Sequence, residues 1–122
     1  MRRGILGPVY VAGPMRDIDA YNFPAFHAAA ERLRKEGVDV VDPAELDEAE
    51  PFAPGSMPVE YYKRRDLRAL LRCNTVAVLS GWEGSEGATL EVFVARALGM
   101  RVLDAQTLDD LQIDDDSDDV DM

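Results

Sequence analysis

Several features that define other protein classes are rare or missing in this chain of 122 residues. Its single cysteine, Cys73, cannot form an internal disulfide, which fits a reducing, cytoplasmic setting and a thiol packed in the core. A nucleophilic role for this thiol is disfavoured, because the only imidazole belongs to His27, which we expect to be solvated on its helix. No run approaches the roughly 20 apolar residues of a membrane span, so we expect no membrane partner.

An excess of positive charge is also missing. The chain carries 13 basic and 24 acidic side chains, and nothing in it resembles a basic footprint for DNA or RNA. Nine of the acids are aspartates in residues 104–122, which hold no Lys or Arg, so the remainder is nearly neutral. We therefore expect one α/β domain over residues 1–103 and an acidic tail over residues 104–122. In that tail, residues 107–113 form either a helical turn or an edge contact, and disorder begins near Asp114.

The apolar pattern alternates between strand and helix signals. Short β-branched runs predict strands over residues 8–12, 38–41, 75–79 and 100–103. Helical spacing predicts helices from Asn22 to Gly37, over residues 59–72, and from a glycine-rich turn to Gly99. This order implies a small Rossmann/flavodoxin-like three-layer α/β sandwich with a four- to five-stranded parallel sheet. Residues 43–58 contain four prolines and no periodic pattern, which is typical of a lid or binding loop.

The stretch from Ser80 to Gly99 joins a predicted buried strand to a helix through a turn with three glycines. The apolar face predicted for the helix consists of Leu90, Phe93, Val94, Ala97 and Leu98. Gly87 and Ala88 leave the backbone bare at the helix N-terminus, where free N–H groups attract an anion. Ser85 is either a plain N-cap or a ligand contact. Trp82 either stacks on a base or covers the sheet edge.

The carboxyl ends of three predicted strands should converge on one crevice. They bring together residues 13–16, 42–43 and 80–87. Arg16 is there either an ordinary loop arginine or a clamp for an anion. Tyr10, on the first strand, is typical of a core residue whose hydroxyl needs a partner. This crevice is the candidate ligand site.

Two acids can face the crevice. Asp66 lies in mid-helix, where Asp is unfavourable, and it either faces the crevice or forms a surface ion pair with Lys63 or Arg65. Glu91 has Ala95 at the i+4 position in place of a basic partner, so it is either a crevice carboxylate or a solvent-facing glutamate. Two carboxyl groups in one crevice are typical of glycosidic-bond chemistry, and the same logic serves an N-glycosidic bond.

These residues resemble a known enzyme family. Three motifs carry the likeness: Val9-Tyr10-Val11-Ala12-Gly13-Pro14, Arg65-Asp66-Leu67, and Glu91 followed by Ala95. Over nearly the whole of residues 8–103 they resemble the nucleoside 2-deoxyribosyltransferase superfamily, including its phage-type relatives of uncharacterised function. The resemblance implies catalysis by Glu91 with Asp66, no metal or organic cofactor, and homodimers or larger assemblies.

Departures from the transferase pattern point to one branch of that superfamily. Ser85 stands where transferases usually have an Asp, and Gly87 is followed by Ala88 where they have Gly-Thr. This looks more like the 2'-deoxynucleoside 5'-monophosphate N-hydrolases, in which that serine helps to hold the phosphate. Tyr10 and Arg16 fall where this branch has its active-site tyrosine and a loop arginine. Phe93 departs from both branches, which commonly have a glycine there.

The resemblance therefore implies cleavage of the N-glycosidic bond of a nucleotide, with Glu91, Asp66 and Tyr10 as catalytic residues. The implied substrate-binding residues are Gly13, Pro14, Met15, Arg16, Ser85, Gly87, Ala88 and Trp82. Base exchange and nucleotide binding without turnover are the alternatives. The base stays open, with Trp82, Phe23, Phe26 and residues 43–58 as candidate contacts.

Overall fold

A four-stranded parallel sheet forms the centre of the protein, as the sequence predicts. The computed structural model describes residues 4–111, with strands β1 (Val9–Ala12), β2 (Val40–Val41), β3 (Thr75–Val78) and β4 (Arg101–Asp104). Their order is β2-β1-β3-β4. Tyr10 on β1 is in register with Val41 on one side and Val76 on the other. The connection reverses direction between β1 and β3, which is where open α/β sheets bind ligands.

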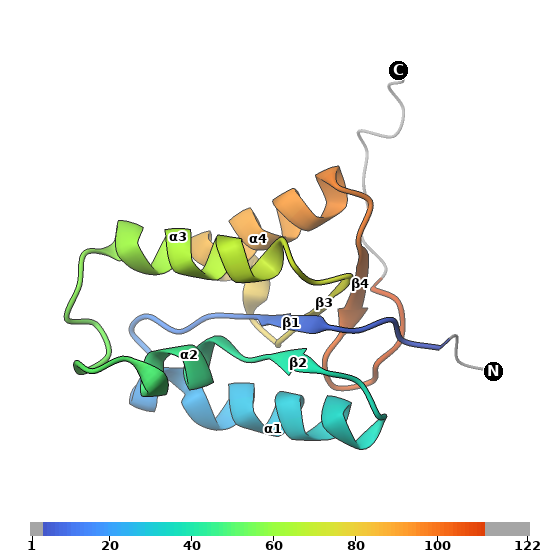
Figure 1. Cartoon of the computed structure of the whole chain (residues 1–122), viewed down its shortest axis with the longest axis horizontal. Coiled ribbons are helices and arrows are strands. Elements are labelled where there is room, and N and C mark those ends of the chain that lie inside the picture. Colours follow the sequence, from blue (N-terminus) through green and yellow to red (C-terminus); the bar gives the residue numbers. More distant parts are fainter. Residues whose placement is uncertain (1–3, 112–122) are drawn as a thin grey trace.

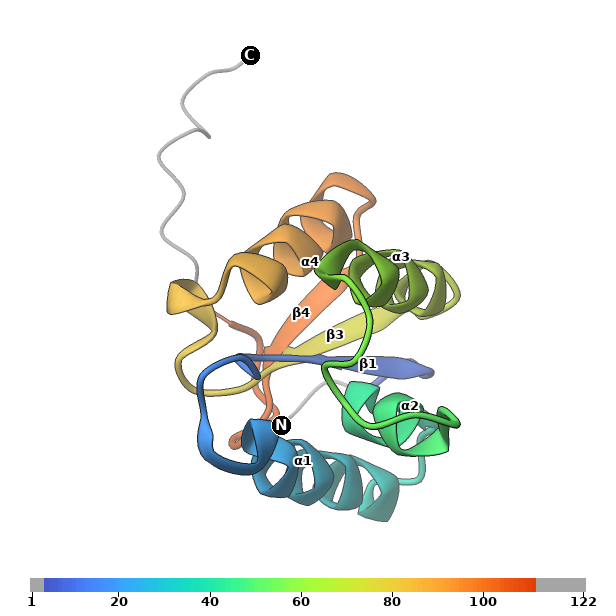
Figure 2. The same cartoon turned by 90° about the vertical axis from the view of Figure 1, so that its left-hand side faces the viewer.

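Helices cover both faces of the sheet. They are α1 (Phe23–Lys35), α2 (Pro43–Ala49), α3 (Val59–Leu70) and α4 (Glu86–Ala97), with short 3-10 turns η1 (Asp19–Asn22) and η2 (Trp82–Gly84) before α1 and α4. Figure 1 and Figure 2 show α1 and α2 on one face and α3 and α4 on the other. The predicted three-layer Rossmann/flavodoxin-like sandwich is thus confirmed.

Alternate residues of β1 supply two separate cores. Val9 and Val11 pack with α1 and α2, whereas Tyr10 and Ala12 pack with α3 and α4. This follows from the two-residue period of a strand. Cys73 is buried in the second core, so the expectation of a packed thiol is confirmed.

Residues 43–58 are not one continuous loop, and that prediction is wrong. Residues 43–49 form α2, because Pro43 suits the first helical turn and the Asp42 carboxylate accepts a hydrogen bond from the Ala44 N–H at 2.8 Å. The helix has only seven residues and buries only three of them, which is too little for an apolar period to be visible. Residues 50–58 connect α2 to α3 (Figure 2).

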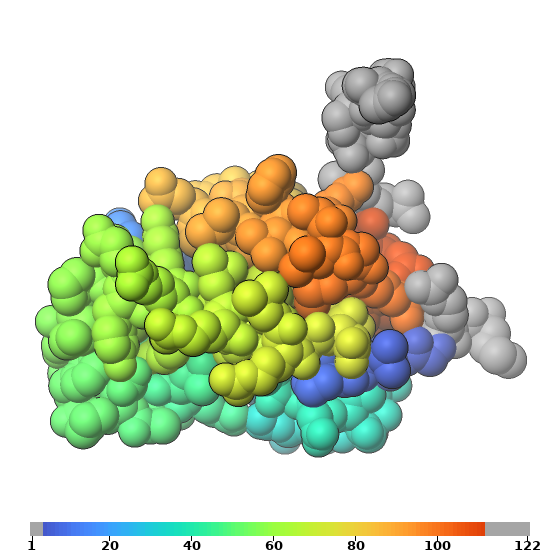
Figure 3. Space-filling view, turned by 45° about the horizontal axis from the view of Figure 1, so that its top comes forward, coloured from blue at the N-terminus to red at the C-terminus, as the bar shows by residue number. Residues whose placement is uncertain are grey.

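The buried face of α4 also differs from the predicted one. Ala88, Val92 and Ala95 are buried, whereas Phe93 and Leu98 are 71% and 58% exposed. The prediction followed the largest apolar side chains, but small residues let a helix approach a sheet closely. Figure 3 shows α3 and α4 side by side on this outer face of the molecule.

His27 is not free in solvent, contrary to the prediction. One ring nitrogen lies 2.8 Å from the Asp42 carboxylate, and the other lies 3.0 Å from the carboxylate of Glu48 on α2. These contacts tie α1 to α2. A helical-face argument within α1 misses them because both partners lie beyond that helix.

The predicted N-cap of α1 is only partly confirmed, whereas the glycines predicted to end α1 and α4 lie where expected. Asn22 occupies the N-cap position of α1, but its amide donates to the Pro14 carbonyl at 2.9 Å instead of capping the helix. Gly37 and Gly99 lie just after α1 and α4 with φ of +86° and +75°, a left-handed conformation that favours glycine at helix ends.

The chain continues to pack beyond β4. Leu103 and Asp110 form an antiparallel bridge, which is the edge contact that the sequence left as one of two alternatives. Ala105 and Leu108 are buried in the α1/α2 core. The disorder predicted from Asp114 lies outside the described residues. Within residues 4–111, no helix is both long and apolar enough to cross a membrane.

Candidate active site

A cavity of 590 Å³ lies at the carboxyl ends of β1 and β3. Its walls come from the β1–α1 loop, from α2 and the connection after it, from α3, and from the start of α4. This is the ligand-binding position expected for a parallel sheet with this strand order. The sequence-predicted residues that line it are Tyr10, Gly13, Pro14, Met15, Arg16, Asp66, Ser85, Gly87, Ala88 and Glu91.

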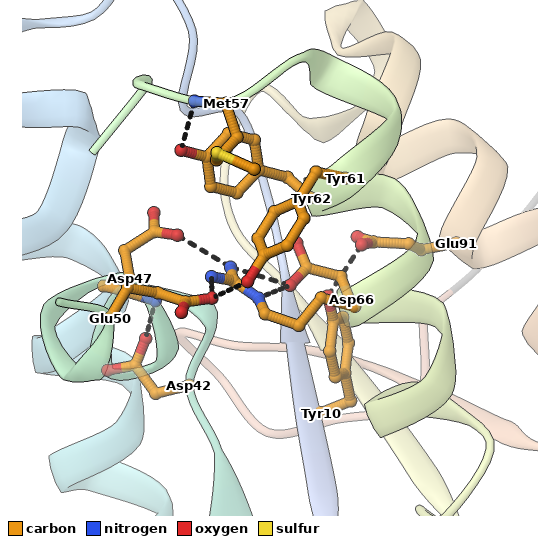
Figure 4. Close-up of polar contacts among 11 residues, drawn as sticks. Tyr10, Asp42, Asp47, Glu50, Met57, Tyr61, Tyr62, Asp66 and Glu91 are labelled. Atoms are coloured by element: carbon orange, nitrogen blue, oxygen red, sulfur yellow. Dashed lines mark hydrogen bonds and ion pairs between the residues drawn. The ribbon is translucent and has the colours of Figure 1, made fainter. Parts of the chain in front are cut away.

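Glu91 projects from α4 toward the sheet and meets Tyr10 (Figure 4). The Tyr10 side chain is fully buried, and its hydroxyl donates a hydrogen bond of 2.7 Å to Oε2 of Glu91. This is the only hydrogen bond that residues 4–111 make to the Glu91 carboxyl group. Glu91 is therefore a crevice carboxyl without a cationic partner in the described part of the chain, and the solvent-facing alternative is excluded.

Asp66 both faces the crevice and forms an ion pair with Arg65, which the sequence offers as alternatives. Nε of Arg65 donates a hydrogen bond to Oδ1 of Asp66 at 3.0 Å, so the predicted ion pair with Arg65 is present. Both residues nevertheless line the cavity, and the Asp66 side chain is only 16% exposed. The pair thus belongs to the cavity wall and not to the open surface.

Burial sets the protonation of these groups. It raises the pKa of Glu91 to about 8, against the Tyr10 hydrogen bond and with a smaller contribution from the Asp66 charge. It raises the pKa of Asp66 to about 6, although the neighbouring Arg65 charge lowers it. Burial and then the Glu91 charge raise the pKa of Tyr10 well above 10, so its hydroxyl keeps its proton. Between those two carboxyl pKa values, the pair holds one proton.

The N-terminus of α4 forms another part of the wall. Oγ of Ser85 accepts a hydrogen bond from the Ala88 N–H at 3.1 Å, so the N-cap interpretation of Ser85 is confirmed. A Cβ built on Gly87 would meet no atom within 4 Å, so the space beside this residue is open. The guanidinium of Arg16 makes no hydrogen bond or ion pair with the described part of the chain. These features leave an anion-binding arrangement available.

Packing against Leu79 leaves no space for a side chain at Gly13. A Cβ at this position would lie 2.6 Å from Cδ1 of Leu79, which is buried in the core. A larger residue would therefore push the β1–α1 loop away from β3. Pro14 and Met15 continue the same stretch of cavity wall.

Trp82 does not reach the cavity. It lies in η2 and packs against the core that contains Tyr10 and Val78, which agrees with its alternative role of covering the sheet. Among the other candidate base contacts, Phe26 and Met57 line the cavity, and Phe23 does not.

Sequence reasoning missed the polar residues that α2 and α3 add to the site. Nη2 of Arg65 pairs with Oδ1 of Asp47 at 2.7 Å, and Nη1 pairs with Oε2 of Glu50 at 3.2 Å (Figure 4). The guanidinium carbon lies 5.3 Å from the centre of the Tyr62 ring. Asp47 and Tyr62 also line the cavity. No local pattern pairs Arg65 with acids on another helix, so the sequence held no usable signal.

A second cluster has donor atoms for a cation. One donor atom each of His27, Asp42 and Glu45 lies within 4.8 Å of the others. However, Arg34 pairs with both oxygens of Glu45 at 2.8 Å, and Asp42 accepts from His27 and from the Ala44 N–H. These contacts already occupy the donor atoms of the three side chains, and they join α1 to α2.

Comparison with known proteins places the chain in a family without an assigned activity. A family profile described as "Domain of unknown function (DUF4406)" matches residues 8–104. The chain belongs to the DUF4406 family. The matched range of this DUF4406 domain contains the whole carboxyl pair and the N-terminus of α4. No curated protein matches the chain.

Proposed function

We propose that this protein cleaves the N-glycosidic bond of 2'-deoxynucleoside 5'-monophosphates. The observation that carries this proposal is the cavity carboxyl pair: Glu91, held by the Tyr10 hydroxyl at 2.7 Å, with Asp66 close enough to raise its pKa. Glycosidic chemistry needs one carboxylate at the anomeric carbon and one group that moves a proton. A pair that holds one proton near neutral pH supplies both once that proton lies on Asp66.

In the proposed reaction, substrate binding moves the proton from Glu91, which holds it at neutral pH, to Asp66. An oxygen of the Glu91 carboxylate then bonds to C1' of the sugar while the C1'–N bond breaks. The electron pair of that bond stays on the base nitrogen, and the base takes up the proton that the pair holds, through Asp66. Water then attacks C1' and gives its proton to Asp66, and the bond to Glu91 breaks. The products are the free base and 2-deoxyribose 5-phosphate.

We place the phosphate at the part of the cavity wall formed by the β1–α1 loop and the N-terminus of α4. Arg16 and the N-terminus of α4 are the cationic and dipolar features there, and the open space beside Gly87 admits an oxygen close to the backbone. Ser85 would contribute its hydroxyl proton, because its lone pair already accepts the Ala88 N–H. Binding at this wall would orient C1' toward Glu91.

The test is incubation of the protein with a panel of 2'-deoxynucleoside 5'-monophosphates and the matching nucleosides, with free base followed by chromatography. We expect base release from monophosphates. No release at micromolar protein over hours would overturn the proposal and favour nucleotide binding without turnover. Excess free adenine or cytosine distinguishes base exchange, because a new nucleotide would form in place of the sugar phosphate.

We also propose a homodimer and a reducing, cytoplasmic setting. Leu71, Phe93 and Leu98 are 59%, 71% and 58% exposed on the α3/α4 side, which a second copy would cover. Cys73, buried and free, needs no oxidising compartment. Light scattering tests the assembly: we expect twice the mass of one chain, and Phe93→Ser should lower it.

A further inference from the structure

Asp47 has a carboxylate oxygen that the described residues, 4–111, leave without a partner. Its side chain is only 8% exposed and lines the cavity. Oδ1 accepts a hydrogen bond from Arg65 at 2.7 Å, whereas Oδ2 has no hydrogen-bond partner among residues 4–111. A buried acceptor without a donor costs free energy. Such an atom on a cavity wall points to a donor on a ligand.

The charges around Asp47 also favour a donor. Arg65 is the cation that pairs with Asp47, and its three nitrogens contact Asp66, Glu50 and Asp47. Three carboxyl groups therefore surround one guanidinium. A ligand edge that carries N–H groups is attracted to this wall, and an edge that carries only carbonyl oxygens is repelled.

This wall has the apolar surface that a planar base needs. Pro54, Met57, Val59 and Tyr62 line the same cavity as Asp47, and the Tyr62 ring packs against Arg65, the partner of Asp47. Figure 4 shows Asp47 on the opposite side of Asp66 from Glu91. Arg65 pairs with both aspartates. A sugar held at Glu91, with its phosphate toward the start of α4, would extend its base toward this wall.

We propose that Asp47 selects nucleotides whose base carries an exocyclic amino group, such as cytosine or adenine. The free oxygen of Asp47 accepts a hydrogen bond from that amino group. This inference rests on the proposed function, because it assumes a deoxynucleotide with its sugar at Glu91. Replacing the amino group with a carbonyl places two acceptors against each other at that position. The neighbouring ring nitrogen of uracil or hypoxanthine carries a proton, but it must move into the place of the amino group to reach Asp47, so we expect binding to weaken about tenfold or more.

The experiment is calorimetry with two matched pairs of ligands on the unmodified protein: 2'-deoxycytidine and 2'-deoxyuridine 5'-monophosphates, and their deoxyadenosine and deoxyinosine counterparts. We expect the amino-bearing member of each pair to bind about tenfold tighter or more. Equal affinities, or tighter binding of the carbonyl members, would overturn the inference. Base release is measured separately. If the two members of each pair bind equally but base is released, the inference about Asp47 is wrong and the proposed function stands. If the amino-bearing members bind more tightly but no base is released, only the proposed function is wrong.

Two variants assign the preference to Asp47. Asp47→Asn should bring the two members of each pair to within about threefold of each other, because an amide can turn either a donor or an acceptor to the base. Glu50→Gln is the matched control, since Glu50 also pairs with Arg65 but does not line the cavity. It should keep the preference. If Glu50→Gln removes the preference equally, the preference acts through Arg65, and the inference is wrong. Should Asp47→Asn fail to fold, the affinities of the unmodified protein still decide.

Discussion

Two acids of this protein, the buried Asp42 and the half-buried Glu91, show how burial can serve either the fold or a reaction. The Asp42 side chain is 0% exposed and accepts hydrogen bonds of 2.8 Å from both the Ala44 N–H and His27. Glu91 has a single donor among the described residues, the neutral hydroxyl of Tyr10, and it borders a cavity. Burial raises the pKa of both acids. The difference lies in how far the protein has satisfied each carboxylate.

That difference assigns the two acids to different tasks. The contacts of Asp42 cap α2 and fasten it to α1, so its desolvation is offset by hydrogen bonds within the fold. Glu91 lacks such compensation, which makes its charged form unfavourable until a ligand supplies a partner. A positively charged, oxocarbenium-like sugar carbon is such a partner. Variants that affect one acid should therefore change activity, and those that affect the other should change stability.

Asp66→Asn should give the largest loss among the partners of Glu91. Without its proton carrier, base release should fall about a hundredfold or more for bases that leave poorly and less for those that leave easily. The measurement is kcat for release of adenine from its deoxynucleotide and for release of a base that leaves more easily. Glu60→Gln, an exposed acid on α3, serves as the control and should be unaffected. Equal losses for both bases would contradict the proton-carrying role.

The pH profile of base release should be bell-shaped. The active form is the pair with one proton, so kcat/KM should fall about tenfold per pH unit below about 6, where Asp66 gains a proton, and above about 8, where Glu91 loses its own. The measurement is kcat/KM from pH 4.5 to 9.5, with folding checked at each end. A flat profile across this range would show that the pair does not share the working proton.

Tyr10→Phe should lower kcat several-fold to about tenfold, because Glu91 loses its only described donor. The same change removes a hydrogen bond that lowers the pKa of Glu91, so the upper limb of the pH profile should move to higher pH. Tyr21→Phe is the matched control, since its hydroxyl also borders the cavity but makes only a 3.4 Å contact with the Pro54 carbonyl. Equal effects of the two changes would contradict a specific role for Tyr10.

Asp42→Ala should have the smallest effect on activity and a clear effect on stability. Loss of the α2 cap should lower the free energy of unfolding by about 1–2 kcal/mol, with kcat within a few-fold of the parent. Thermal and urea unfolding measure this, with Glu31→Ala on the exposed side of α1 as the control. An unchanged melting temperature would show that Asp42 is not the structural member of the comparison.

The sequence predicts the parts of this site that depend on local order. A β-branched run, a glycine-rich turn and a helix place Glu91 and Ser85 at the carboxyl end of β3, because a parallel sheet leaves few other arrangements. Tyr10 is recognisable as a core tyrosine that needs a partner, but the identity of that partner, Glu91, comes only from the sheet register and the position of α4.

The parts that depend on contacts between distant elements could not be predicted. Arg65 meets Asp47 only because α2 and α3 border the same cavity, and His27 meets Asp42 only because α1 lies against α2. The buried face of α4 differs from the one that the sequence predicts, because Ala88 and Ala95 give a weak apolar signal although they are buried. Short helices and small residues leave little trace in apolar periodicity.

Glu91→Gln tests the central claim most directly. The amide keeps the volume and can still accept the Tyr10 hydrogen bond, but it lacks the charge that stabilises an oxocarbenium-like carbon, so kcat should fall about a hundredfold or more. The pKa of Glu91 is raised from 4.5 to about 8, so the folded protein holds this proton more tightly and loses stability as pH rises through that range. At pH 8 the variant should therefore melt at the same temperature as the parent or higher. A variant that releases base within a few-fold of the parent rate would contradict the claim that Glu91 carries out the chemistry.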